Sequence, residues 1–490
     1  MSAEVLLIAF AFIVVAIELL NLSSGTKLKA AFTFSFFGFA AAGVAAILQN
    51  DTAELFANAL VIDPVSQFFK ALLCFSCVLI VLMARISKEI REHERNEFYI
   101  LLMLTILGMC IFCSAAHMLV LFLSFVMASL GCNILVVFYR RNPASSEAGV
   151  KLFVHTSLTV LLLSIGIAML YAIAGSFQIS VIKEHIAKLS IANDTLFYLW
   201  SAFALVLIAV ASLTAIFPFH AVFPDVIQGA ATPVSAFLTV GPPVIGVAFL
   251  FRLCLQIFSV KTDTGWAEHT GFHWQSLMAG LAVATMTLGN LLALRQKNIK
   301  RMLSYACIAQ MGYLLLGISV ATKIGVAAIL YFLASNVLVV LGCFLIVQMA
   351  TDQNQNGDIT SLKGLAWKNP FLAVAFSVFV LSLAGMPPLP GFVGRFYVLG
   401  AAVEQKQFWL VFFVLFNWVV GLSYFLQLLH QVIKSESSVD AERSTQGILN
   451  EAVSLVRVCL AVIFVPAIFV GISWEPFLNF ISRSLDSAKW

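Results

Sequence analysis

The chain has 490 residues, of which 61% are apolar or aromatic and 11% are charged. An average soluble domain has about 45–50% apolar and about 25% charged residues, so this chain has too few charges to cover a soluble surface. The composition therefore predicts an integral membrane protein. The formal net charge of +4 is too small to indicate a nucleic-acid partner.

Apolar runs long enough to cross a bilayer, about 20 residues each, predict the membrane spans in chain order. In the first half of the chain these runs lie at residues 4–22, 29–48, 66–85, 98–114, 117–138, 152–174 and 196–217. In the second half they lie at residues 233–258, 275–294, 302–321, 324–349, 371–390, 408–430 and 452–474. We expect an all-α polytopic membrane protein with about 14 transmembrane helices, because barrel strands alternate in polarity whereas these runs are continuous.

Basic residues outside the predicted spans are concentrated in the loops that follow odd-numbered spans. The positive-inside rule places such loops in the cytoplasm. With an even number of spans, both termini are then expected on the periplasmic side. The first run lacks the basic region and cleavage site of a signal peptide, and no transit peptide precedes it. We therefore expect a multi-pass protein of a bacterial inner membrane.

The nine cysteines fall in apolar stretches, where we expect reduced core residues. Two pairs, Cys74 with Cys77 and Cys110 with Cys113, have the CxxC spacing of metal-ligand sets. On a spanning helix, however, residues three apart merely share a face, and no polar residues surround these pairs. The sequence also contains no phosphate-binding loop or nucleotide fingerprint. It therefore indicates no catalytic residue, cofactor or metal in this chain.

Two predicted spans are interrupted, the seventh near residues 217–233 and the twelfth near residues 385–391. The residues at these breaks are Pro218, Pro224 and Pro233, followed by Pro387, Pro388, Pro390 and Gly391. Proline removes a backbone donor, and freed backbone groups at membrane depth are tolerated only beside protein or water. Breaks five helices apart are typical of the paired repeats of transporters. The spacing therefore predicts two inverted five-helix repeats with discontinuous helices 7 and 12.

Three segments resemble the antiporter-like membrane subunits of proton-pumping NADH:quinone oxidoreductase, respiratory complex I. They are Phe219–Val234 (FHAVFPDVIQGAATPV), Asn298–Tyr313 (NIKRMLSYACIAQMGY) and Leu383–Tyr397 (LAGMPPLPGFVGRFY). The double proline and the GFVGRFY ending are most similar to the subunit N group of that family. The resemblance covers roughly residues 60–430, in order and at similar spacing.

The resemblance implies four parts of the chain. They are an N-terminal three-helix segment (1–97), a first antiporter-like repeat of helices 4–8 (98–258), a second of helices 9–13 (275–430), and a C-terminal helix and tail (452–490). It also implies a proton relay made of a glutamate in the fifth span and lysines in the seventh, eighth and twelfth. At those positions this sequence has Val126, Leu213, Pro243 and Arg395.

The relay is therefore largely missing, because three positions cannot titrate and arginine essentially never deprotonates in proteins. Either protons take another route, or this subunit is a structural part of a complex that pumps elsewhere. The remaining proton-path candidates are Arg395, His220, His155 and Arg252, with His117 near the outer end of the fifth span. For a lone intramembrane histidine, the alternative is a packing residue with satisfied hydrogen bonds.

By this resemblance, the chain is a membrane-arm subunit that helps couple electron transfer from NADH to quinone with proton translocation. It takes part in enzyme activity only within the complex, and FMN, iron–sulfur clusters and quinone belong to partner subunits. The expected partners are other membrane-arm and hydrophilic subunits and the lipid bilayer. The alternative is an Mrp-type cation/proton antiporter subunit without redox partners, which the double proline and the missing relay disfavour.

Overall fold

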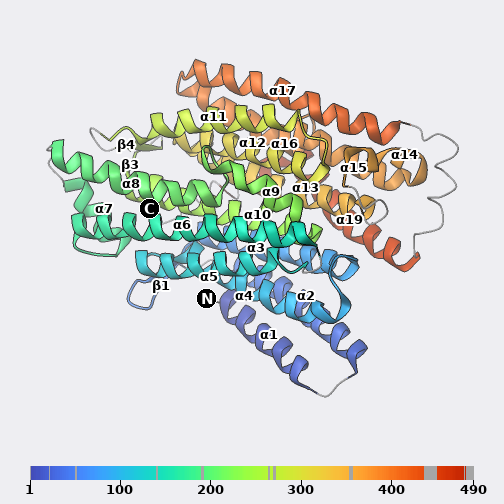
Figure 1. Cartoon of the computed structure of the whole chain (residues 1–490). Coiled ribbons are helices and arrows are strands. Elements are labelled where there is room, and N and C mark those ends of the chain that lie inside the picture. The colour runs from blue at the N-terminus through green and yellow to red at the C-terminus, as the bar shows by residue number, and fades with distance from the viewer. Residues whose placement is uncertain are drawn as a thin grey trace.

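The computed structural model describes residues 2–20, 23–49, 52–139, 142–188, 193–262, 265–268, 272–351, 357–434, 450–478 and 481. Across these residues, long helices run broadly side by side, with two short β-hairpins and the small helix α7 toward one end (Figure 1). Twelve described helices are long and apolar enough to cross a membrane. The predicted all-α polytopic architecture is therefore confirmed, whereas the exact number of spans and the inverted repeats remain predictions.

The N-terminal part consists of three long helices and one hairpin. Its elements are α1 (Ser2–Leu19), α2 (Ser24–Leu48), β1 (Ala53–Leu55), β2 (Leu60–Ile62) and α3 (Pro64–Ile86). The two strands pair antiparallel. Helix α3 begins at Pro64 because proline suits the first helical position and because Asp63 caps the helix, accepting the Ser66 N–H at 2.9 Å.

The middle of the chain contains the first interrupted span. Its elements are α4 (Arg95–Ser114), α5 (Met118–Val136), α6 (Pro143–Ala174), α7 (Ile179–Lys188), α8 (Asn193–Leu213), α9 (Val222–Gly229) and α10 (Thr232–Leu250), which continues as a π-helical turn (Phe251–Ile257). Helix α6 begins at Pro143 after the cap Asn142 and ends at Gly175, whose φ of 68° closes the helix.

The second half repeats this pattern of long helices with one interruption. Its elements are β3 (Ser259–Lys261), β4 (Trp266–Glu268), α11 (Trp274–Ala293), α12 (Ile299–Val320), α13 (Lys323–Thr351), α14 (Leu365–Lys368), α15 (Pro370–Ala384), α16 (Pro390–Glu404), α17 (Phe408–Ile433) and α19 (Asn450–Ile472). Strands β3 and β4 pair antiparallel. The predicted tail after this helix lies mostly outside the described residues.

Helices α10 and α12 form the centre of the bundle, and almost every side chain along them is buried by other helices. Helix α12 packs closely against α11 through glycines. A Cβ at Gly289 would lie 2.7 Å from the Ala309 nitrogen, and one at Gly312 would lie 2.6 Å from the Met286 nitrogen. Small residues allow such close backbone approach between membrane helices, so no larger side chain fits at either position.

Two predicted spans end earlier than their apolar runs. The run at 196–217 continues past the end of α8 at Leu213, and the run at 371–390 continues past the end of α15 at Ala384. The sequence predicted both spans too long because the residues after each helix remain apolar. The backbone nevertheless turns there, at Ala215 with φ of 54° and at Gly385 with φ of 79°.

Candidate functional site

The first break lies between α8 and α9 and is closed by contacts with a neighbouring helix. The Ile216 N–H donates to the Ala211 carbonyl at 2.9 Å. The Phe217 N–H donates to the Thr285 hydroxyl of α11 at 3.2 Å. Protein groups therefore satisfy the backbone that this break exposes, as membrane depth requires.

The predicted break residues take different places around these turns. Pro218 lies in the turn itself, in a cis peptide bond with Phe217. Pro224 lies in the first turn of α9 and Pro233 in the first turn of α10. A first helical turn has no acceptor for the backbone N–H of those positions, so proline is accommodated there at little cost.

His155 on α6 reaches toward the end of α8 through a short hydrogen-bond chain. Its Nε2 lies 2.7 Å from the Ser212 hydroxyl, which lies 2.5 Å from the Thr159 hydroxyl. Thr159 in turn donates to the carbonyl of His155 at 2.8 Å. Because Thr159 uses its proton on that carbonyl, Ser212 donates to Thr159 and Nε2 donates to Ser212. The neutral imidazole then presents Nδ1 as its free acceptor.

A cavity opens beside His155, between α5, α6, α8, α9 and α10. The centres of water molecules can occupy about 60 Å³ of it, whereas about 10–15 Å³ is enough for one water. Ser212, Ser129 and Thr156 give its wall some polar character. Leu213, where the resemblance predicts the seventh-span lysine, also lines it. The cavity is mostly apolar but large enough for several waters next to His155, and it lies where the resemblance predicts a relay lysine.

A charged pocket of about 410 Å³ lies one helical turn from this cavity along the contact between α6 and α9. Lys151, which precedes His155 by one turn, contacts Asp225 of α9 at 3.0 Å and Glu147 at 2.8 Å. Arg301 of α12 contacts the other oxygen of Asp225 at 2.6 Å. These side chains remain partly exposed, so solvent reaches this pocket.

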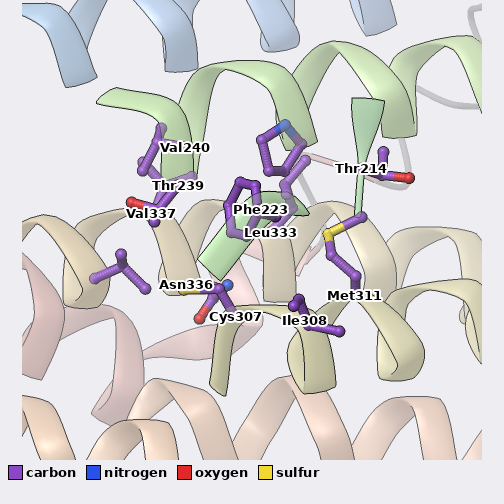
Figure 2. A pocket seen from close by; sticks show the side chains of 12 residues that line it. Thr214, Phe223, Thr239, Val240, Cys307, Ile308, Met311, Leu333, Asn336 and Val337 are labelled. Atoms are coloured by element: carbon purple, nitrogen blue, oxygen red, sulfur yellow. The ribbon is translucent and has the colours of Figure 1, made fainter. Parts of the chain in front are cut away.

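A second, smaller cavity lies between the first break and helices of the second half of the chain (Figure 2). The centre of a water molecule can occupy about 10 Å³ of it, which is about enough space for one water. Thr214 of the break, Thr239 of α10 and Asn336 of α13 contribute polar atoms to a mostly apolar wall. Pro243, where the resemblance predicts the eighth-span lysine, also lines it.

The second break is held together by Arg395, which extends from α16 back to the end of α15. Its guanidinium donates to the Ala384 carbonyl at 2.8 Å and to the Leu383 carbonyl. It also donates to the Gln310 side chain at 3.1 Å and lies 4.8 Å from the centre of the Tyr313 ring. Helix α15 thus ends on a cation, which stabilises its last carbonyls and the negative end of its dipole.

The charge of Arg395 is almost fully buried, with 3% of its surface exposed. Within the described part of the chain it forms no ion pair, and its compensation comes from carbonyl oxygens and aromatic rings. Pro387 and Pro388 form the turn, joined by a cis bond, while Pro390 and Gly391 begin α16. Arg395 therefore caps the end of α15, at the position where the resemblance predicts the twelfth-span lysine.

The other predicted candidates lie at helix ends. Arg252 donates twice to the Cys113 carbonyl, at 2.7 and 3.2 Å, and so caps α4. His117 caps α5, because its Nδ1 accepts the Leu119 N–H at 3.3 Å. His220 packs beside the Phe217 ring at 5.9 Å, and its buried Nδ1 has no hydrogen-bond partner among the residues seen in the structure.

Val126 lies on α5, where its carbonyl accepts the Ser129 hydroxyl at 3.0 Å. The sequence reasoning missed Ser212 and Thr159 as partners of His155. The spacing of His155 and Thr159, which places them on one helix face, was an available signal. No comparable signal pointed to Ser212. Across the described ranges, no group of three or more His, Cys, Asp and Glu residues is placed to hold a metal ion.

The long helices and two interrupted spans define a polytopic membrane subunit of the antiporter type. Residues 115–421 match the family model described as NADH:quinone oxidoreductase/Mrp antiporter, TM. The chain belongs to this family, and within it to the subunit N group.

Similar proteins support both levels of this assignment. NADH-quinone oxidoreductase subunit N of Trichlorobacter lovleyi is 32% identical over 84% of this chain and 83% of the relative. Subunit N 2 of Sorangium cellulosum is also 32% identical, over 100% and 97%. Among solved structures, a chain of respiratory complex I from Thermus thermophilus aligns with a TM-score of 0.77 at 25% identity, covering 97% of this chain and 98% of that one.

A chain of the Mrp complex from Dietzia shares the fold, with a TM-score of 0.80 at 19% identity, over 98% of this chain and 96% of that one. At this identity the similarity concerns the fold alone. The antiporter-type fold is therefore common to both classes, and the sequence relatives distinguish between them.

Proposed function

We propose that this chain is a membrane-arm subunit of proton-translocating NADH:quinone oxidoreductase, in which electron transfer from NADH to quinone drives proton movement. The observation that carries the proposal is its similarity to subunit N relatives over nearly its full length. The redox chemistry takes place in partner subunits, which hold FMN, iron–sulfur clusters and the quinone. Within the membrane arm, this chain is either a module that translocates protons itself or a structural module.

We infer that residues 98–258 and 275–430 form two inverted repeats, preceded by the segment 1–97 and followed by 452–490. The supporting observation is that each candidate repeat contains one interrupted span, with breaks after Leu213 and Ala384. Glu89, in the loop after α3, lies 3.6 Å from Lys300 at the start of α12. Loops rich in basic residues thus meet on one face, in keeping with termini on the periplasmic side of a bacterial inner membrane.

Protons, in this proposal, enter the first repeat through the charged pocket at Asp225 and Lys151 and reach His155 by water in the cavity. The Ser212–Thr159 chain ends on the carbonyl of His155 itself, so it orients the imidazole without leading protons onward. The imidazole accepts a proton at Nδ1 and returns it to cavity water. Histidine suits this step because one ring nitrogen can accept a proton while the other remains a hydrogen-bond donor.

Of the other candidates, Arg395 and Arg252 cap helix ends. His220 lies at the first break, where its Nδ1 has no hydrogen-bond partner among the described residues. A fixed charge at Arg395 favours a deprotonated or anionic neighbour but cannot carry a proton itself. The proposed route therefore rests on His155. If His155 carries no protons, the subunit is a structural module of a complex that pumps elsewhere.

The test is proton pumping by the intact complex in membrane vesicles, after assembly has been confirmed on a native gel. We compare wild type with His155→Gln, which keeps a hydrogen-bond donor but does not titrate, and with Ser212→Ala, which keeps the titratable ring. We expect His155→Gln to lower the protons moved per electron and Ser212→Ala to have a smaller effect. Unchanged pumping in both variants would exclude this route and favour the structural module.

The same preparation separates the two classes of complex. We expect the chain to migrate with NADH:quinone oxidoreductase activity on the native gel. Migration with an assembly that lacks this activity but exchanges sodium ions for protons would instead establish the Mrp-type alternative. His220→Ala and Arg395→Ala complete the series, since both candidates lie at breaks.

A further inference from the structure

A buried ion pair links the first and third helices, outside both candidate repeats. The Lys70 ammonium on α3 lies 2.5 Å from Glu4 Oε1 on α1. The exposed fractions of the two side chains are 0% and 4%. Charged residues in membrane helices are costly and generally mark functional positions, yet neither residue has a place in the proposed route.

The protein leaves some hydrogen-bonding capacity of the Lys70 ammonium unused. An ammonium group has three donors, and Lys70 Nζ has no further acceptor in hydrogen-bonding geometry within the described part of the chain. A buried pair of this kind gains little stability from its charges, because removing both ions from water costs about as much as their attraction returns. Transfer of the proton from nitrogen to oxygen removes both charges and, with them, the cost of keeping two ions out of water.

Among the residues that the structure describes, thiols and a second, more distant ion pair lie around this pair. Cys74 and Cys77 follow Lys70 on α3, and Cys110 and Cys113 of α4 lie within electrostatic reach of both charges. Beyond them, Arg252 on the π-helical turn faces Asp63 at 3.9 Å. Within the pair itself, the ammonium of Lys70 and the carboxylate of Glu4 face each other directly.

Glu4 lies in the first turn of α1, and polar side chains are grouped at this end of the helices. Gln67 lies one turn before Lys70 and donates to the Gln49 side chain at 3.4 Å, and Ser2 donates to the same Gln49 oxygen at 2.9 Å. Ser2 is exposed. The buried pair therefore lies close to the exposed end of α1, where these hydrogen-bonding side chains are found, on the side where both termini are proposed to lie.

We propose that Glu4 and Lys70 form a proton-exchange site on the N-terminal segment, open to this end of the helices. In the exchange, the N–H bond of the ammonium breaks and an O–H bond forms on Glu4. The carboxylic acid then releases its proton to water near Ser2, which leaves a carboxylate and a neutral amine. Uptake follows the reverse order, so one proton enters and leaves without an oxidant, reductant or cofactor.

The test is infrared spectroscopy of the purified complex, in which the C=O stretch of a protonated carboxylic acid is read at neutral pH. The spectrum of wild type minus that of Glu4→Gln isolates the Glu4 signal. Glu18→Gln is the matched control, because Glu18 lies near the other end of α1, exposed and bonded to Asn96. An exposed glutamate has a pKa of about 4.3 and gives no such band at neutral pH.

We expect a Glu4 band in wild type and in Glu18→Gln that shifts promptly in heavy water. The proposal would be overturned if the Glu4 carboxyl group stayed fully ionised at neutral pH, as an exposed glutamate does. It would also be overturned if the Glu4 band did not shift in heavy water. If Glu4→Gln does not assemble, the apolar pair Glu4→Met with Lys70→Met replaces it as the reference. The reversed pair, Glu4→Lys with Lys70→Glu, should restore the band.

Discussion

Replacement of Arg395 by methionine tests whether this residue acts as a cap of α15. The change keeps a long side chain but removes the donors to the Leu383 and Ala384 carbonyls and to Gln310. Two acceptors keep a second donor: Gln310 still donates to Leu383 at 3.3 Å, and Trp418 to Ala384 at 2.9 Å. The Gln310 oxygen loses the guanidinium donor.

The magnitude follows from these remaining contacts. A hydrogen bond to a charged group contributes about 1.5–3 kcal/mol, and an unsatisfied buried acceptor costs about 1–3 kcal/mol. Since only one acceptor loses its partner and a buried charge is also removed, we expect the break to lose about 3 kcal/mol of local stability. This corresponds to about a hundredfold increase in the equilibrium constant for local opening.

The assay is amide hydrogen exchange in the purified complex. The reporters are the N–H groups of Gly385 and Met386, which donate to carbonyls in the last turn of α15 at 2.9 and 3.0 Å. We expect their exchange to accelerate about a hundredfold in Arg395→Met. Arg395→Lys should have an intermediate effect, because an ammonium cannot contact all three acceptors with planar geometry.

Arg252→Met is the matched control, since it removes the corresponding cap from α4 and should affect exchange there instead. Unchanged exchange at Gly385 and Met386, together with reduced proton pumping, would refute the capping role of Arg395. The residue would then act through its charge on the proton route.

Three further outcomes are expected. Gly391→Ala should prevent assembly on a native gel, because its Cβ would collide with the Ser382 carbonyl oxygen, whereas Gly400→Ala, with open space around it, should assemble normally. Asn417→Leu removes its hydrogen bonds to α11 and should lower stability by about 1–3 kcal/mol, seen as earlier thermal aggregation. Asp225→Asn should change stability by less than about 1 kcal/mol, as for other exposed ion pairs, while slowing proton uptake in vesicles.

The positions of the two breaks were accessible from sequence, whereas their internal contacts were not. Proline and glycine act on the backbone within a few residues, so Pro218, Pro387 and Gly391 marked the interruptions directly. The exact helix ends at Leu213 and Ala384 were missed, because the following residues are equally apolar. The turn depends on backbone dihedrals that a hydropathy pattern does not contain.

For the candidate site as well, the sequence identified single residues, whereas their contacts were found only in the structure. His155 could be selected as an intramembrane histidine, but its partner Ser212 lies on another helix and was found only in the structure. Arg395 could be recognised as a charge that does not titrate, but its bonds to the end of α15 required the fold of the break. Lys70 could be counted within a span, but its pairing with Glu4 depends on how α1 packs against the bundle.

The sequence by itself determined the membrane class, the order of the spans, the two interruptions and the family. These properties depend on composition, on local backbone chemistry and on motifs of neighbouring residues, all of which are present in the linear order of the residues. The tertiary structure alone decided which buried polar groups have partners and where water can enter. Those features depend on the rotation and depth of each helix against its neighbours, which are set by packing across the whole bundle.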